Sequence, residues 1–174
     1  MGLITGKVEG RGIVRVYIGG VMQGSRQDKA IEDQGYRQAI TRSVRAQHPA
    51  AEIVDPQALF PDSPAYDDER ARQVFFDLVE AAAGADVVIA YLPEASMGTA
   101  MEMVRAYDAG TPVVSISPMG TNWFIRFLSR CVFPTLEAFG EWVEKGGLAA
   151  LISARATAVP QVWGRIDRRQ PDAR

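Results

Sequence analysis

Short apolar runs alternate with amphipathic stretches along most of the chain. The clearest run, residues 86–91, is apolar after its first residue, which is typical of a strand buried on both faces of a parallel sheet. Between the runs, apolar side chains recur every three or four residues, as they do on one side of a helix. The pattern predicts strands at 13–18, 52–54, 86–91, 112–117 and 132–133, and helices at 28–48, 67–83, 99–109, 123–128 and 135–145.

Strands that alternate with helices favour parallel βαβ units joined by right-handed crossovers. We therefore expect an α/β fold, namely a three-layer, Rossmann-like (flavodoxin-like) domain with a parallel sheet of about five strands. The 174 residues are enough for one domain, which we place at 13–146. Residues 1–12 are predicted to be a flexible N-terminus, and residues 147–174, where the periodicity fades, an extended C-terminal tail.

The composition limits the chemistry open to the protein. A single histidine, His48, and a single cysteine, Cys131, leave no disulfide within the chain and no zinc site of several Cys and His ligands. We expect His48 at the solvated surface, because it precedes a proline at a predicted helix end, and Cys131 as a small buried hydrophobe. No metal and no cofactor are expected, so the chemistry must come mainly from carboxylates, hydroxyls, amides and backbone groups.

The charge narrows the range of partners. The net charge is −2 at pH 7, and no concentrated basic face suits a nucleic-acid polymer. No run approaches the ~18 apolar residues of a membrane span, and the first residues lack a sustained apolar signal region. We expect a small-molecule ligand, no nucleic-acid polymer, no membrane contact and a cytoplasmic location.

Two loops that follow predicted strands carry unusual residues, and ligands of open parallel sheets bind beyond the carboxyl ends of the strands. The first loop, 19–26, is rich in glycine, which lets a backbone approach a ligand closely. It contains neither G-x-G-x-x-G nor G-x-x-x-x-G-K-[ST]. A Rossmann-type reductase is therefore the least favoured function.

The second loop leads into a helix that is predicted to begin near Thr99. Gly98 and Glu102 share one face of this helix at i, i+4 spacing, so a carboxylate lies within about a turn of its positive end. The Ser96 hydroxyl and the Gly98 N–H are able to bind an anionic or hydroxylated ligand group. A helix-start glutamate that only offsets the dipole has the same pattern, so both interpretations stay open at this point.

Three segments together resemble the nucleoside 2-deoxyribosyltransferase-like superfamily. They are Tyr-Ile-Gly-Gly at 17–20, Ala-Asp-Val-Val-Ile-Ala at 85–90 and Ser-Met-Gly-Thr-Ala-Met-Glu at 96–102. Within the superfamily the likeness is strongest to the 2′-deoxynucleoside 5′-phosphate N-hydrolases, whose first loop matches 19–28 in length. The resemblance covers residues 14–114, and its most specific part is S-x-G-x-x-x-E after an apolar strand.

The resemblance implies a role for each matching residue. Glu102 would be the nucleophile at the anomeric carbon, Tyr17 would position it, and Asp77, one residue out of the family's spacing, would be the second carboxylate. Substrate contacts are implied for Gly19, Gly20, Met22, Gly24, Arg26, Ser96 and Gly98, the last two at a 5′-phosphate.

The resemblance also bears on assembly and on phosphate binding. Asn122 stands where related transferases bring a residue from the adjacent subunit, so we expect a homodimer with the active site near the interface. Val21 and Gln23 replace the loop serine and arginine of the hydrolases, which leaves Arg26 to supply that positive charge.

These residues predict an N-glycosidase that hydrolyses the N-glycosidic bond of a (deoxy)nucleoside 5′-monophosphate and releases nucleobase and sugar phosphate. A carboxylate beside the anomeric carbon stabilises or captures an oxocarbenium-like state without metal or histidine. One alternative is a nucleoside 2-deoxyribosyltransferase, in which a second nucleobase replaces water. The other is a non-catalytic nucleotide-binding or sensing module.

Overall fold

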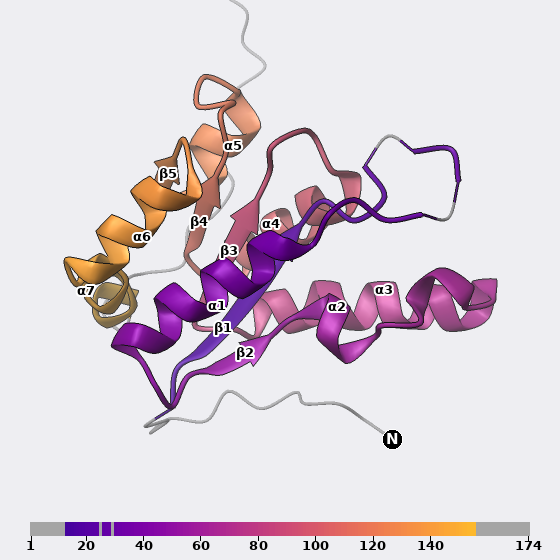
Figure 1. Ribbon diagram of the computed structural model, residues 1–174, viewed down its shortest axis with the longest axis horizontal. Helices are drawn as coiled ribbons and strands as arrows, with labels where there is room; N and C mark the ends of the chain where they lie inside the picture. Colours follow the sequence, from indigo (N-terminus) through magenta and orange to yellow (C-terminus); the bar gives the residue numbers. More distant parts are fainter. Residues whose placement is uncertain (1–12, 25, 29, 156–174) are drawn as a thin grey trace, which may run out of the picture.

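Five parallel strands form the sheet at the centre of the fold (Figure 1), in the order β2-β1-β3-β4-β5. The strands are β1 (Arg15–Gly20), β2 (Glu52–Val54), β3 (Val87–Tyr91), β4 (Val113–Ile116) and β5 (Cys131–Phe133). The computed structural model describes residues 13–24, 26–28 and 30–155. The strand order reverses between β1 and β3, and this switch point is where open α/β sheets bind ligands. The predicted fold class is confirmed.

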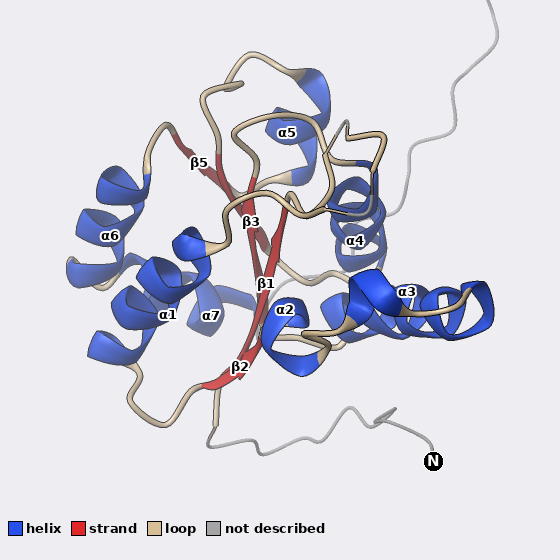
Figure 2. Ribbon diagram, turned by 45° about the vertical axis from the view of Figure 1, so that its right-hand side comes forward, coloured by secondary structure: helices blue, strands red, loops and turns tan. Residues whose placement is uncertain are grey.

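Helices cover both faces of the sheet (Figure 2). They are α1 (Gly35–Gln47), α2 (Pro56–Leu59), α3 (Asp68–Ala83), α4 (Met97–Asp108), α5 (Trp123–Leu128), α6 (Leu136–Glu144) and α7 (Gly147–Arg155), with a 3-10 turn at Ser63–Ala65. Helices α1, α6 and α7 pack their apolar sides on one face, and α3, α4 and α5 on the other. Within the described residues, no helix has both the length and the apolar character needed to cross a membrane.

Local side-chain bonds fix where several helices begin. Asp67 accepts a 2.8 Å hydrogen bond from the Arg70 backbone N–H at the start of α3, and Ser96 accepts one of 3.4 Å from Thr99 at the start of α4. Both are N-caps, which satisfy backbone donors that the first turn leaves free. Helix α4 starts at Met97, two residues before its predicted start, so Gly98 lies inside its first turn.

The first helix begins seven residues later than the sequence pattern predicts, at Gly35 instead of residue 28. The described residues before it, 28 and 30–34, form a loop, because the Asp28 carboxylate binds the Arg26 side chain and the Ala30 backbone N–H. The backbone N–H of Glu32 then donates to the carbonyl of Met22 at 2.7 Å. These bonds take the place of helical ones, so the prediction of a helix is wrong for residues 28 and 30–34.

The prediction of an extended tail from residue 147 is wrong for its first nine residues. Gly146 turns the chain at a φ of 81°, and α7 follows at once. Leu148 is fully buried against the α1–α6 layer, which makes this helix part of the core. The predicted flexible N-terminus, 1–12, and residues 156–174 lie outside the described residues.

Candidate active site

Tyr17 and Glu102 meet beside the switch point of the sheet. Tyr17 lies in β1 with its side chain fully buried, and its hydroxyl donates a 2.6 Å hydrogen bond to Oε1 of Glu102 on α4. Strand β1 presents Tyr17 to the α3–α4 layer, because successive side chains of a strand point to opposite faces. The structure thus joins the predicted nucleophile to its predicted positioning residue.

The second carboxylate oxygen of Glu102, Oε2, is buried and has no hydrogen-bond partner among the described residues, although Glu102 as a whole is partly exposed. A buried carboxylate without full solvation prefers its neutral form. Burial raises the pKa of Glu102 from 4.5 to about 7, against smaller lowering effects of the Tyr17 hydrogen bond and the positive charge of Arg37. The group therefore changes charge near neutral pH, as catalytic carboxylates often do.

Two glycines let these side chains come close to β1. A Cβ on Gly19 would lie 2.7 Å from Oε2 of Glu102 and 3.4 Å from the methyl of Thr99. A Cβ on Gly20 would collide with the Tyr36 hydroxyl on the opposite face of the sheet. The two glycines, predicted to contact substrate, thus leave room for functional side chains on both faces of β1.

The start of α4 lies beside the same carboxylate. The Ser96 hydroxyl caps the helix, and Gly98 offers a backbone N–H in a first turn whose donors have no intrahelical partner. The buried hydroxyl Oγ1 of Thr99 makes no hydrogen bond with the described residues. This turn therefore combines free N–H donors, a positive helix end and Glu102 within about one and a half turns.

The residues of the first loop that are predicted to contact substrate differ in their surroundings. Gly24 adopts a left-handed φ of 57° and leaves no room for a Cβ beside the Glu94 carboxylate, while Met22 is half-buried. The exposed Arg26 binds Asp28 through two 2.8 Å hydrogen bonds and forms a 3.4 Å ion pair with Glu32. Its charge is thus already compensated by two carboxylates in this conformation.

The structure places Asp77 and Asn122 away from the Tyr17–Glu102 hydrogen bond. Asp77 lies on the exposed side of α3, where it accepts a 2.8 Å hydrogen bond from Gln73. Asn122 caps α5 by accepting from the backbone N–H groups of Phe124 and Ile125. No described contact joins either side chain to Glu102, and their predicted roles stay predictions.

An open pocket of about 440 Å³ lies at the carboxyl end of the sheet, next to Gly20. Tyr36 and Tyr91 line it, with ring centroids 4.2 Å apart and planes inclined by 20°. Its wall also carries the carboxylates of Glu32, Asp33 and Glu94. Neither Tyr17 nor Glu102 lines it, so the pocket and the candidate nucleophile flank the Gly19–Gly20 segment from opposite faces of the sheet.

The sequence matches no protein-family model and no curated protein. Its structure is similar to a 2-deoxyribosyltransferase from Bacillus psychrosaccharolyticus, with a TM-score of 0.59 and 18% identity over 79% of this chain and 96% of that one. It is also similar to a conserved protein from Enterococcus faecalis V583, with a TM-score of 0.56 and 19% identity over 77% and 99% of the two chains.

The chain has the nucleoside 2-deoxyribosyltransferase-like fold. A more distant similarity is to a CMP N-glycosidase from Clostridium botulinum, with a TM-score of 0.47 and 14% identity over 78% of this chain and 98% of that one.

Two charged residues near the candidate site, Arg37 and Asp55, were not identified from the sequence. Arg37 on α1 is only 3% exposed and forms a 3.0 Å ion pair with Asp55, which follows β2. The signal was present in the pattern, because Arg37 lies three residues before Ile40 and seven before Val44 on the apolar side of α1. A charged residue at a core-facing helix position needs a buried partner, and here it has one.

His48 and Cys131 are the single histidine and the single cysteine of the chain. His48, expected at the solvated surface, is half-buried at the end of α1, with its Nε2 atom buried. Cys131 is half-buried in β5, and burial raises the pKa of its thiol, which disfavours the nucleophilic thiolate. The described ranges contain no group of three or more His, Cys, Asp or Glu side chains placed to hold a metal ion.

Proposed function

We propose that this chain is an N-glycosidase that hydrolyses the N-glycosidic bond of a (deoxy)nucleoside 5′-monophosphate, with Glu102 as nucleophile. The observation that carries the proposal is the buried Tyr17–Glu102 hydrogen bond of 2.6 Å beside the switch point of the sheet. The second oxygen of Glu102, Oε2, packs against the backbone of Gly19, where a side chain would displace the carboxylate.

In the proposed reaction, ionised Glu102 attacks the anomeric carbon as the bond to the nucleobase breaks, and the base leaves with the bonding electron pair and takes up a proton. Water then attacks the same carbon and gives up a proton to the ionised Asp77, the ester to Glu102 breaks, and the carboxylate is regenerated. The Tyr17 hydrogen bond holds Oε1 in place, so that Oε2 points at the reacting carbon. Asp77 is the proposed proton donor to the base.

Two parts of the site suit different ends of such a substrate. The first turn of α4, with Ser96 and Gly98, suits the 5′-phosphate, because free N–H groups and the helix dipole favour an anion. The pocket beside Gly20 repels a phosphate through its three carboxylates and offers stacked tyrosines to a base. It lies across the Gly19–Gly20 segment from Glu102, so a base bound there has to reach over the end of β1. The compensated charge of Arg26 makes the free nucleoside an essential comparison substrate.

Transfer to a second nucleobase is the other candidate reaction, because the similar structure with a TM-score of 0.59 is that of a 2-deoxyribosyltransferase. Both reactions share the glycosyl-enzyme on Glu102 and differ only in the acceptor. An added acceptor base that yields a new nucleoside faster than free sugar indicates transfer.

The test is to incubate the protein with nucleosides and their 5′-monophosphates, in ribose and 2-deoxyribose forms, and to separate free base by chromatography. We expect base release from at least one monophosphate and none with Glu102→Gln. If no nucleoside or nucleotide yields base, with or without an acceptor, the enzyme proposal fails. Ligand binding without turnover would instead support the sensing module.

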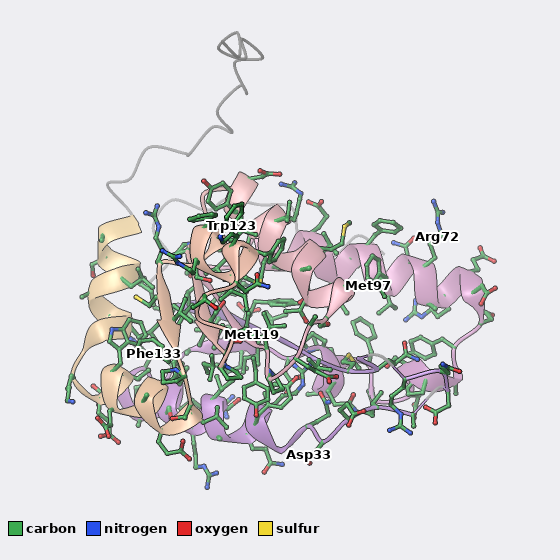
Figure 3. All side chains as sticks on the ribbon, turned by 90° about the horizontal axis from the view of Figure 1, so that it is seen from above. Asp33, Arg72, Met97, Met119, Trp123 and Phe133 are labelled. Atoms are coloured by element: carbon green, nitrogen blue, oxygen red, sulfur yellow. The ribbon has the colours of Figure 1, made fainter. Side chains whose placement is uncertain are left out.

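We also propose that the chain forms a homodimer with the active site near the interface. Large apolar side chains are exposed on the layer that carries Glu102: Met97 on α4 is 86% exposed, and Trp123 and Phe127 on α5 are 74% and 63% exposed. Figure 3 labels Trp123 and Met97 on these two helices. Apolar surface of this kind commonly marks a protein interface.

A further inference from the structure

The end of strand β1 is held by a charged side chain where its neighbouring strand stops. Strand β2 ends at Val54, paired with Tyr17, so β1 continues past it without a strand on that side. There Nη1 of Arg37 donates a 2.8 Å hydrogen bond to the carbonyl oxygen of Ile18. The guanidinium thus takes the place of a hydrogen bond from the neighbouring strand, just before the glycine-rich loop begins.

Arg37 is itself fixed by two further bonds. Its Nη1 donates to Oδ1 of Asp55 at 3.0 Å, and its Nε donates to Oε1 of Gln34 at 2.7 Å. The same Asp55 oxygen accepts from the backbone N–H of Gln57 and so caps α2. One buried cation therefore ties together α1, β1 and the segment after β2, with its planar fork in a single orientation.

The residue that Arg37 holds is the link between the two contacts of Glu102. Ile18 lies between Tyr17, whose hydroxyl binds Oε1, and Gly19, whose backbone faces Oε2. A shift of the Ile18 carbonyl moves both neighbours relative to the carboxylate. A buried ion pair adds little to the free energy of unfolding, because the cost of desolvating both charges offsets most of their attraction. The Arg37–Asp55 pair is therefore better explained by its effect on the position of β1.

We propose that Arg37 is a positioning residue for Glu102: it holds the end of β1, which carries Tyr17 and Gly19, in a fixed place beside that carboxylate. The inference rests on the proposed role of Glu102. It adds a residue that makes no contact with the reacting atoms and acts through Ile18 and through its charge.

The charges around Glu102 fit this assignment. Tyr17 of β1 donates to the carboxylate, Arg37 of α1 lowers its pKa, and burial acts in the opposite direction. On the neighbouring helix the exposed Asp77 binds Gln73, and on α4 itself Arg105 is engaged by Glu80 through hydrogen bonds of 2.8 and 2.9 Å. Burial raises the pKa of Tyr17 most, the negative charges of Glu102 and Asp55 raise it further, and Arg37 lowers it.

The experiment follows the titration of Glu102 directly, so it does not depend on turnover. Protein labelled with ¹³C at glutamate carboxyls is titrated by NMR, and the Glu102 signal is assigned by its loss in Glu102→Gln. Arg37→Gln removes the charge and the fork, Arg37→Lys keeps the charge, and Arg42→Gln removes an exposed arginine of the same helix as the control. Where a substrate is turned over, kcat and KM are measured across the same pH range.

We expect Arg37→Gln to move the Glu102 titration upward by roughly one pH unit and to move the acidic limb of kcat/KM with it. Arg37→Lys keeps the titration near that of the wild type but lowers kcat, because lysine has one nitrogen and cannot bind Gln34 through Nε while it binds Ile18 and Asp55 through Nη1. Arg42→Gln changes neither.

Titration of Glu102 at the same pH in Arg37→Gln and wild type overturns the proposal, whatever happens to thermal stability. If Arg37→Gln does not fold, Arg37→Met removes the positive charge while its apolar side chain fills the buried space and Asp55 is kept; the upward shift is expected there too, and its absence is equally decisive. A wild type without turnover defeats the proposed function alone, since the titration still decides the role of Arg37.

Discussion

The hydroxyl of Tyr17 donates a 2.6 Å hydrogen bond to Oε1 of Glu102, and this bond joins the central strand β1 to helix α4. It leaves Oε2 of the same carboxylate buried and without a partner among the described residues. One carboxylate oxygen is thus held by a hydrogen bond, which fixes the orientation of the proposed nucleophile. Burial raises the pKa of Glu102 to about 7, so its charge depends on pH in the neutral range.

Replacement of the Tyr17 hydroxyl should affect both rate and pH dependence. The nucleophile must be ionised, so wild-type kcat/KM is expected to rise with pH through a limb near 7, the pKa of Glu102. Tyr17→Phe loses a hydrogen bond to a charged group, and we expect a fall in kcat of about 10- to 100-fold. Because the Tyr17 hydrogen bond lowers the pKa of Glu102, the limb should also move to higher pH. Steady-state kinetics from pH 5 to 9 measure both effects.

The matched control for this substitution is Tyr66→Phe, since the described contacts give the Tyr66 hydroxyl no bond to Glu102. Its profile should overlie that of the wild type. A Tyr17→Phe enzyme with an unmoved limb would contradict the assignment of that limb to Glu102.

Glu102 should also make folding stability depend on pH. The folded protein holds the proton up to about pH 7, whereas the unfolded chain releases it near the ordinary value of 4.5. Between these values the folded state binds more protons, so the free energy of unfolding falls as the pH rises and levels off above 7. Glu102→Gln removes this loss and should stabilise the protein at pH 8 by at most about 3 kcal/mol. Urea unfolding at pH 5 and pH 8 measures the difference, with the exposed Glu69→Gln as a control that changes little at either pH.

Gly19 should be needed for the position of the carboxylate and not for folding. A Cβ there would lie 2.7 Å from Oε2 of Glu102, so the side chain must swing aside in Gly19→Ala. A displacement near 1 Å costs about 100-fold in kcat, while the thermal unfolding midpoint should change little. Gly140→Ala in α6 is the matched control, because its Cβ meets only Ser43 Oγ at an ordinary 3.6 Å. It should keep full activity and raise stability by up to about 1 kcal/mol. Full activity in Gly19→Ala would show that Oε2 does not need its present position.

The sheet and the Glu102 helix were predictable from the sequence because both depend on local signals. The apolar β3, and the cap with the periodic helix α4, are each encoded in consecutive residues. The S-x-G-x-x-x-E spacing puts Glu102 near the start of that helix, and its proposed role came from the family resemblance. The start of α1 failed for the opposite reason. Arg26 and Asp28 bind each other through side chains, and such a loop competes with a helix that the pattern alone favours.

The sequence of α7 contains a helical pattern, but a weak one. Leu148, Leu151 and Ile152 have the i, i+3, i+4 spacing of a helix face, yet alanines between them blur the pattern, and only packing on the α1–α6 layer gives the helix its inner side. The contact of Arg37 with Ile18 joins residues nineteen positions apart and depends on where β2 ends. A contact of that kind follows from tertiary structure, and no spacing rule predicts it.

The leaving base needs a proton, and the proposed mechanism assigns its delivery to Asp77. On that assignment Asp77→Asn should lower kcat by about 100-fold or more. The loss should shrink for substrates whose base leaves easily without protonation, such as a 7-methylated purine. Glu69→Gln, a change of another exposed carboxylate on α3, is the control and should leave kcat unchanged. An unchanged kcat in Asp77→Asn would remove this residue from the mechanism and agree with its exposed hydrogen bond to Gln73.

The exposed apolar side chains of α5 should decide whether the chain dimerises. Trp123 is 74% and Phe127 63% exposed, and their rings lie 6.2 Å apart, so a charge at each position places a like-charge pair in any interface that covers them. Light scattering coupled to size-exclusion chromatography should give the mass of two chains for the wild type and of one chain for Trp123→Asp/Phe127→Asp. Ile13→Asp, at an apolar residue 54% exposed before β1, is the control and should remain dimeric.

If the partner completes the site, base release should fall with the dimer fraction as the protein is diluted. A wild type that is monomeric at micromolar concentration would refute the proposed dimer and leave the chemistry of Glu102 to a single chain.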